Sequence, residues 1–426
     1  QIPEGSEWSA YDNLLIEPET AKNFCLQAPF NKRPPQENEP PKITIPDNLP
    51  LNFRSSTSTQ ASFGNILNAL SRGNTDLASR IVTTSPDVTV STNLGPWVNQ
   101  RGVFSLDVRN DVFRDEKVAS AQKWLRHGTG QHFELGIAEN NLFIMLAALG
   151  LSGPLFGTRL LPIGTLYDPF IARGLDSLNY ACYQDARFML VATPAGITLA
   201  PEGGAHQSIS SPLIGIGQPG LSSYEPAYAD ELAVIMRWAF EYMQAEKGGS
   251  IYLRLSTRAI DQPSREMKPE LENQIIKGAY WHIPPTDGAR IAIVYSGAVV
   301  PEVIEAYEQL KEEIPELGIM AITSYDRLYH DWQRSQVENI EGRNNIDCHI
   351  INLLAPLHSN AILITVQDAH PATLSWLGSA TGRKLLPLGV TEFGQSGNIR
   401  DLYRQYGIGA DAIIDAAARA SIKHSN

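Results

Sequence analysis

Cysteine and long apolar runs are scarce in this 426-residue sequence. The three cysteines, Cys25, Cys182 and Cys348, are too few and too scattered for a disulfide framework or a zinc site, and they suit a reducing compartment. No apolar run reaches the roughly 18 residues that a membrane span needs, and the polar segment 1–8 does not resemble a signal peptide. We therefore expect a cytoplasmic protein with no membrane span.

Positive charge is also in short supply. The chain carries 34 basic and 46 acidic residues, a net charge of −12, which makes nucleic acid or an anionic membrane an unfavourable partner. Its 43% hydrophobic and 19% charged residues are ordinary for a soluble globular protein, and its length allows two or three domains. The first residue is Gln rather than Met, which indicates a fragment or a processed product.

Regular structure is expected to begin near residue 56. The first 55 residues show little periodicity, and the stretch 34–41 (Pro-Pro-Gln-Glu-Asn-Glu-Pro-Pro) cannot continue a helix or a sheet ladder. We expect residues 1–55 to form an extended linker on a neighbouring surface, or else a disordered tail. Residues 262–270 indicate a second linker, between a unit at 56–262 and a unit at 263–426.

Apolar strands alternate with amphipathic helices in both units. Helical spacing is present at 60–70, 171–183, 229–245 and 299–313, and an apolar helix ends at Gly150. Short strands are expected at 80–84, 160–164, 187–193, 250–255 and 361–366, with further apolar segments at 290–297 and 318–323. This alternation predicts an α/β fold in which each unit is a doubly wound parallel sheet with helices on both faces.

One acid, Glu139, lies at the N-terminal end of the helix that ends at Gly150. This helix is apolar nearly all round, so we expect it to be buried, and a carboxylate there is costly to desolvate unless something uses it. The alternative is a first-turn acid that complements the helix dipole. Residues 136–141 (Gly-Ile-Ala-Glu-Asn-Asn) resemble the pyrimidine-domain motif of thiamine-diphosphate enzymes of the transketolase and 2-oxo-acid dehydrogenase superfamily. The resemblance implies that Glu139 hydrogen-bonds a ring nitrogen of the aminopyrimidine and so activates the cofactor.

A second chemical feature follows the strand expected at 187–193. Residues 202–207 (Glu-Gly-Gly-Ala-His-Gln) combine an imidazole with two glycines, which let the backbone turn tightly beside a ligand. A lone loop histidine is usually only solvated. This segment, however, resembles the Asp-Gly-Pro-Thr-His-Gln motif of transketolases, which implies that His206 faces the substrate carbonyl as a proton or hydrogen-bond donor. Glu202 is expected to help position it.

Other strand ends carry candidate cofactor-binding residues, because open α/β sheets bind ligands there. Residues 85–91 resemble the Ser-Ala-Asp-Leu-Thr loop that lines the transketolase active-site channel, which makes Asp87 a candidate. After the 160–164 strand the family supplies aromatics that stack on the aminopyrimidine, and Tyr167 and Phe170 are the candidates here. Either ring can equally be plain core. At 368–371 (Asp-Ala-His-Pro) the resemblance implies support of a dimer.

This sequence lacks the motif with which the family binds the diphosphate. The family binds the metal and the diphosphate through a Gly-Asp-Gly motif followed later by Asn-Asn, and this sequence contains no Gly-Asp-Gly. We therefore predict no metal ligand in this chain. Mg²⁺ and the diphosphate of thiamine diphosphate are expected on another domain, upstream on a longer chain or on a separate subunit. The resemblance also implies a homodimer.

Departures from the transketolase pattern indicate the substrate. Transketolases grip sugar phosphates with a histidine at the position of Pro194, and their aspartate is Glu202 here. Glu139 with its Asn-Asn, together with residues 224–228 and 393–397 (Phe-Gly-Gln-Ser-Gly), instead resembles the homodimeric pyruvate dehydrogenases. We expect oxidative decarboxylation of pyruvate or a similar 2-oxo acid, with acyl transfer to the lipoyl group of an acyltransferase. Transketolase-type ketol transfer and an inactive module that kept the fold are the alternatives.

Overall fold

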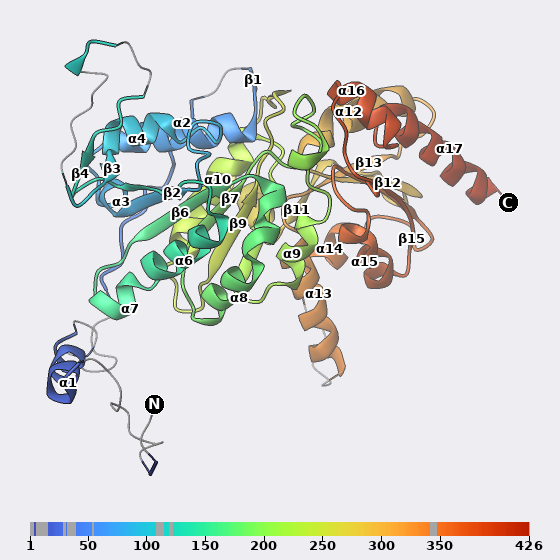
Figure 1. Ribbon diagram of the computed structural model, residues 1–426. Coiled ribbons are helices and arrows are strands. Elements are labelled where there is room, and N and C mark those ends of the chain that lie inside the picture. Colours follow the sequence, from blue (N-terminus) through green and yellow to red (C-terminus); the bar gives the residue numbers. More distant parts are fainter. Residues whose placement is uncertain are drawn as a thin grey trace.

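The computed structural model describes residues 4–5, 16–28, 31, 40–52, 55–107, 115–118, 122–340 and 347–425. Within them the chain folds into two α/β units that lie side by side, the second one in orange and red (Figure 1). The α/β class expected from the sequence is confirmed. Most of the proline-rich stretch 34–41 lies outside the described residues.

An eight-stranded sheet forms the centre of the first unit, and its described strand pairs are parallel. Its central strands are short apolar runs, such as Met-Leu-Val-Ala in β7, which suits strands that are buried on both faces. The spatial order is β4-β3-β5-β2-β6-β7-β9-β8. The strands are β2 (Ile81–Ser85), β3 (Val103–Phe104), β4 (Arg126–His127), β5 (His132–Glu134), β6 (Leu161–Leu166), β7 (Met189–Ala192), β8 (Leu221–Tyr224) and β9 (Ser250–Arg254).

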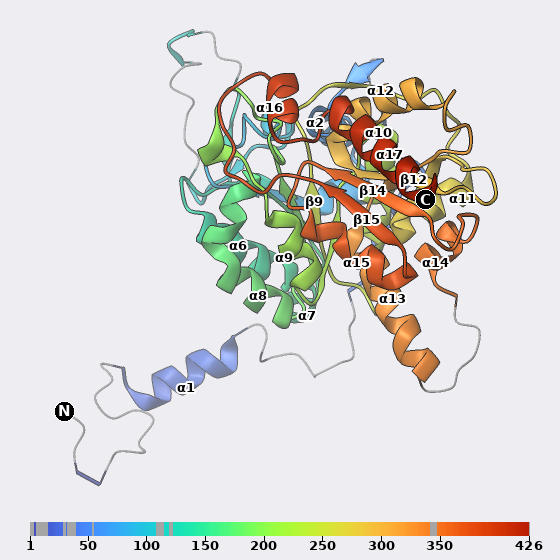
Figure 2. The same cartoon turned by 90° about the vertical axis from the view of Figure 1, so that its right-hand side faces the viewer.

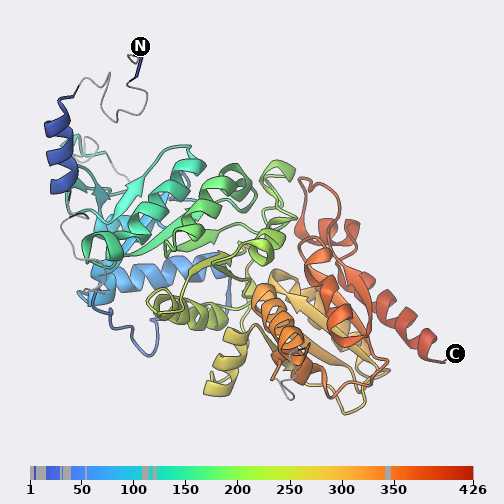
Figure 3. The ribbon, with the colours of Figure 1, turned by 90° about the horizontal axis from the view of Figure 1, so that it is seen from below.

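Helices cover both faces of this sheet (Figure 1, Figure 3). Alternate residues of β7 point to opposite faces of the sheet. Met189 and Val191 belong to one apolar cluster, whereas Leu190 and Ala192 belong to another. The first cluster includes residues of α2 (Thr59–Ser71), α4 (Gly95–Arg101) and α10 (Ala229–Tyr242). The second includes residues of α6 (Glu139–Gly150) and α8 (Leu175–Tyr183). Shorter helices of this unit are α3 (Asp76–Arg80), α7 (Ser152–Phe156) and α9 (Ser211–Gly217).

The second unit is built on a five-stranded sheet with the order β11-β13-β12-β14-β15. This sheet is mixed rather than wholly parallel as expected, because β11 pairs antiparallel with β13. Residues 284–290 join β11 to β12 without a helix, and so short a connection cannot make the crossover that parallel strands need. The strands are β11 (Ala279–Ile283), β12 (Ile291–Ser296), β13 (Gly318–Ile322), β14 (Ile362–Gln367) and β15 (Lys384–Leu388).

Helices also cover both faces of the second sheet (Figure 2). On one face lie α12 (Val300–Leu310) and α17 (Ala410–Ser425), and on the other lie α13 (Tyr325–Ile340), α14 (His349–Leu354) and α15 (Ala372–Thr381). The remaining helices are α11 (Pro269–Lys277) and α16 (Ile399–Gln405). One apolar cluster contains residues of both units, such as Tyr224 of β8 and Tyr295 of β12. The units therefore share a core, and the division at residue 262 stays a prediction.

We expected the first 55 residues to be extended or disordered, but part of this segment is helical. Residues Pro18–Gln27 form α1, a helix with no buried residue. Further along, Ile43 and Leu49 are buried in the large apolar cluster, and the Ile43 N–H donates to Gln244 Oε1 at 2.6 Å. The short strands β1 (Ser56–Thr57) and β10 (Ile260–Asp261) then pair, which brings the two ends of the 56–262 segment together.

Two helices of the first unit also differ from expectation. The helix α6 is not buried all round, because Asn141 is exposed and Ile144 is 53% exposed. The helix expected at 171–183 begins as a 3₁₀ helix, η2 (Asp168–Gly174), whose first turn contains Pro169, and continues as α8. In the described part of the chain, no helix is both long and apolar enough to cross a membrane.

Candidate active site

Three expected site residues meet at the carboxyl ends of two adjacent strands. Tyr167 and Phe170 follow β6, and His206 lies in η3 (Gly204–His206), within the connection that leaves β7. Because β6 and β7 are parallel neighbours, these connections open at the same edge of the sheet. The Tyr167 and Phe170 rings stack with centroids 6.0 Å apart, and the His206 ring meets them edge-on at 5.7 Å and 5.6 Å. We call Tyr167, Phe170 and His206 the ring cluster.

Glu139 is joined to the ring cluster through an arginine that sequence reasoning missed. The Glu139 side chain is 9% exposed, and its Oε1 accepts a hydrogen bond from Arg173 Nη1 at 2.5 Å. The Arg173 guanidinium carbon lies 3.7 Å from the centroid of the Phe170 ring, a cation–π contact. The signal that could have found Arg173 is its spacing of one helical turn from Phe170. Glu139 is also a first-turn acid of α6, so its role beyond the helix dipole stays a prediction.

The His206 imidazole is half-buried and has an unused polar atom. Its Nδ1 is buried and has no hydrogen-bond partner among the described residues. A buried polar atom without a partner is costly, so the site favours a ligand that supplies one. Glu202 is exposed, and in the described structure no hydrogen bond joins it to His206. The positioning role of Glu202 stays a prediction.

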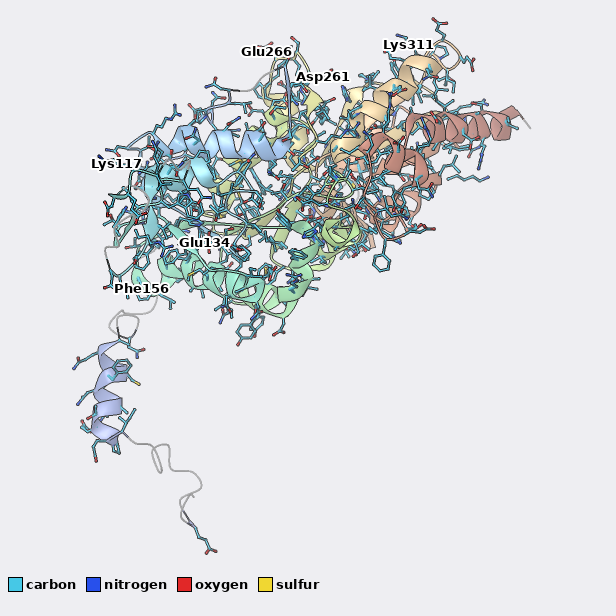
Figure 4. All side chains as sticks on the ribbon, turned by 45° about the horizontal axis from the view of Figure 1, so that its top comes forward. Lys117, Glu134, Phe156, Asp261, Glu266 and Lys311 are labelled. Atoms are coloured by element: carbon cyan, nitrogen blue, oxygen red, sulfur yellow. The ribbon has the colours of Figure 1, made fainter. Side chains whose placement is uncertain are left out.

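Asp87 lies in a loop that a buried polar network holds in place. Its φ is 66°, its side chain is exposed, and its N–H donates to Glu134 Oε1 at 2.9 Å (Glu134 is labelled in Figure 4). Thr89 Oγ1 donates to Glu134 Oε2 at 2.6 Å and lies 3.1 Å from Nε2 of the buried His132. Burial raises the pKa of Glu134, but the bonds from His132, Thr89 and Asp87 outweigh it and lower that pKa. No described hydrogen bond links Asp87 to the ring cluster.

A buried ionic network begins directly after Tyr167 and was not foreseen from the sequence. Asp168 is fully buried, and Arg254 Nε donates to its Oδ2 at 2.9 Å. Arg254 Nη1 donates to Glu225 Oε1 at 2.6 Å, and the Ser208 hydroxyl donates to Asp168. Burial raises the pKa of Glu225, which Arg254 only partly opposes. An arginine directly after the Ile-Tyr-Leu run of β9 is the signal that could have revealed this network.

Metal-binding side chains do not gather in this region. Among the described residues, no group of three or more His, Cys, Asp or Glu side chains could hold a metal ion. The site therefore offers a buried carboxylate, two aromatic faces and an imidazole, all of which suit an organic ring and a carbonyl substrate.

Comparison with solved structures defines the class of protein. A transketolase from Leishmania mexicana superposes with a TM-score of 0.67 and 19% identity, over 89% of this chain and 48% of that chain. A split-gene transketolase, solved as an inactive β4 tetramer, superposes with a TM-score of 0.57 and 18% identity, over 85% of this chain and 98% of that chain. These likenesses show that the chain has a transketolase-type fold.

Sequence comparison adds similarity to one group of thiamine-diphosphate enzymes. The family model of the pyruvate dehydrogenase E1 component middle domain matches residues 53–261. The pyruvate dehydrogenase E1 component of Escherichia coli K12 is 26% identical over 381 residues, which are 84% of this chain and 41% of that protein. The chain thus spans less than half the length of that relative. The family model, these relatives and the shared fold together support a place in the transketolase-like superfamily of thiamine-diphosphate-dependent enzymes.

Proposed function

We propose that this chain forms the pyrimidine side of an enzyme that oxidatively decarboxylates pyruvate or a similar short 2-oxo acid and passes the acyl group to a lipoyl group. The observation that carries the proposal is the ring cluster next to the buried Glu139. The imidazole with a free buried nitrogen, the stacked aromatic pair and the dry carboxylate lie together at one edge of a parallel sheet. The match to the pyruvate dehydrogenase E1 middle domain supports the 2-oxo acid as substrate.

The side chains present fit one end of thiamine diphosphate. Tyr167 and Phe170, the latter with Arg173 over its ring, are the candidates to stack on a planar heterocycle, and Glu139 is a buried acceptor for its nitrogen. We assign the diphosphate and Mg²⁺ to a domain outside this chain, on a longer polypeptide or another subunit, and expect the assembly to be dimeric. The inactive tetramer of a split-gene transketolase, a chain that this one covers almost entirely, supports the need for such a partner.

Each side chain of the site is given one role. Bound thiamine diphosphate supplies a nucleophilic carbon and an electron sink. Glu139 holds a hydrogen bond to the pyrimidine, and its low exposure keeps water from competing for that bond. His206 donates a proton or hydrogen bond to the substrate carbonyl oxygen. Asp87, whose backbone is fixed by Glu134, lines the approach to the site.

Ketol transfer between sugar phosphates is the competing reaction. Pro194, at the position where transketolases place a phosphate-binding histidine, is buried and offers no donor or charge. Pro194 therefore favours the smaller 2-oxo acid, which needs no phosphate-binding side chain. We therefore expect poor binding of ketose phosphates.

The test combines this chain with a diphosphate-binding domain, thiamine diphosphate and Mg²⁺. Oxidation of pyruvate is followed with ferricyanide as electron acceptor, and ketol transfer is followed with xylulose 5-phosphate. We expect turnover of pyruvate only. Ketol transfer alone would assign the transketolase-type reaction, and the absence of both would assign an inactive module.

The role of Glu139 is tested by Glu139→Gln, with Glu270→Gln as a matched control. Glu270 is also a first-turn acid, but it belongs to α11 and is exposed. If Glu139 serves the cofactor, pyruvate turnover should fall by at least about a hundredfold in Glu139→Gln and stay unchanged in the control. Equal turnover in the two variants would reduce Glu139 to a dipole role. His206→Ala should likewise lower turnover, and an unaltered kcat and KM would remove it from the site.

A further inference from the structure

The connection that carries His206 is pinned to the second unit at its start. We call residues 193–208 the His206 loop. The Ile197 N–H donates to both carboxylate oxygens of Asp368, each at 2.9 Å, although the two residues belong to different units. Gly196 has a φ of 57°, and a Cβ at this position would collide with the Asp368 carboxylate. Only glycine lets this carboxylate approach so closely.

The end of the His206 loop is tied to the same point. The Ser208 hydroxyl accepts the Gly196 N–H at 3.1 Å, so the two ends of the loop are bonded to each other. Arg254 Nη2 donates to the Asp368 carbonyl at 3.0 Å and to the Ser208 carbonyl at 3.4 Å. Tyr403 donates its hydroxyl to Asp368 Oδ2 at 3.0 Å, which holds the carboxylate in place. Asp368 is therefore the point where both ends of the loop meet the second unit.

The middle of the His206 loop touches the segment 393–397 of the second unit. Gln207 Nε2 donates to the Gln395 carbonyl at 3.0 Å, and the Gly397 N–H donates to the Ala200 carbonyl at 3.0 Å. A Cβ at Gly204 would collide with the carbonyl oxygen of Gly394. The loop is thus in contact with the second unit on both sides of His206.

We propose that Asp368, assisted by the segment 393–397, is a positioning residue for His206, and that the second unit acts in the reaction by holding this loop in order. Asp368 contacts the loop backbone rather than the ring cluster, so it acts through His206. Its effect on turnover rests on the proposed function, whereas its effect on the order of the loop does not.

The test compares Asp368→Ala with Glu302→Ala. Glu302 is also a buried carboxylate that joins the two units, through two hydrogen bonds of 2.7 Å to Arg258, but its described bonds do not involve the His206 loop. In the 426-residue chain, hydrogen exchange of the backbone amides is measured over residues 193–208, and modification of His206 by diethyl pyrocarbonate is timed. We expect exchange of the Ile197 amide to accelerate at least about tenfold in Asp368→Ala only. His206 should also react faster in that variant.

Two further variants keep the test decisive. Asp368→Asn retains an oxygen acceptor for Ile197 and should restore much of the protection, even if Asp368→Ala does not melt cooperatively. Gln207→Ala removes only the bond to the Gln395 carbonyl and should speed the reaction of His206 without loss of the fold. Equal loop exchange in Asp368→Ala and Glu302→Ala, or unchanged exchange in all four variants, would overturn the proposal.

Kinetics of the completed enzyme separate this proposal from the proposed function. Asp368→Ala should lower kcat for pyruvate at least about tenfold with little change in KM, and Glu302→Ala should leave both unchanged. If the unaltered enzyme shows no pyruvate turnover, the proposed function fails while the exchange results stand. If exchange changes but kcat does not, Asp368 orders the loop without serving the reaction, and its positioning role is refuted.

Discussion

Replacing Arg254 with methionine should destabilise this chain by about 3–5 kcal/mol, the usual cost of removing one partner from a buried ion pair. The Arg254 side chain is 1% exposed, and it bridges Asp168 and Glu225, which are 0% and 5% exposed. Methionine fills much of the same volume but leaves two carboxylates without a cation and out of reach of water. Because two charges lose their partner at once, we expect a loss near the upper end of this range.

The assay is urea unfolding followed by far-ultraviolet circular dichroism at several pH values. The deficit should shrink as the pH falls from about 7 to about 5, because burial raises the pKa of Glu225 and its stranded carboxyl group can then take up a proton. Arg400→Met is the control, since Arg400 pairs with Glu305 at 3.2 Å on the surface and its side chain is 74% exposed. A loss below about 1 kcal/mol for Arg254→Met, or a deficit that grows towards low pH, would refute the reasoning.

Three further predictions concern Asp368, Glu134 and Gly204. Burial raises the pKa of Asp368 from 3.8 to about 6, so its contribution to stability is present below about pH 4 and is lost as the pH rises through about 6, a change of about 3 kcal/mol. Asp368→Asn should remove that part of the pH–stability curve, and an unchanged curve would contradict the shift. The pKa of Glu134 is lowered in the folded chain. Its contribution to the stability of the fold is therefore present above its unfolded pKa and is lost as the pH falls through its folded pKa. Glu134→Gln should abolish this loss of stability at acid pH, measured as the melting temperature. Gly204→Ala should push the His206 loop off Gly394 and lower kcat for pyruvate at least about tenfold, and a normal kcat would show that this contact is dispensable.

Much of the candidate site could be predicted because its candidate residues lie in short, recognisable sequence segments. Glu139 stands out as an acid before an apolar helix, and His206 stands out beside two glycines after a buried strand. Tyr167 and Phe170 follow a strand, and strand ends are where open sheets bind ligands. The structure brings these rings together, while their roles in catalysis stay predictions. Glu202 is exposed and has no described hydrogen bond to His206, so its role stays a prediction as well.

The sequence by itself determined the alternation of strands and helices, since the period of apolar residues decides which face of an element is buried. Only the tertiary structure decided which polar groups that are distant in the chain meet. Ile197 and Asp368 are 171 residues apart in the chain, and Arg173 reaches Glu139 across 34 residues. The direction of β11 was likewise decided by the short connection to β12 and by the packing of the second sheet. These contacts depend on strand order and on how the two units dock, and neither is encoded in local periodicity.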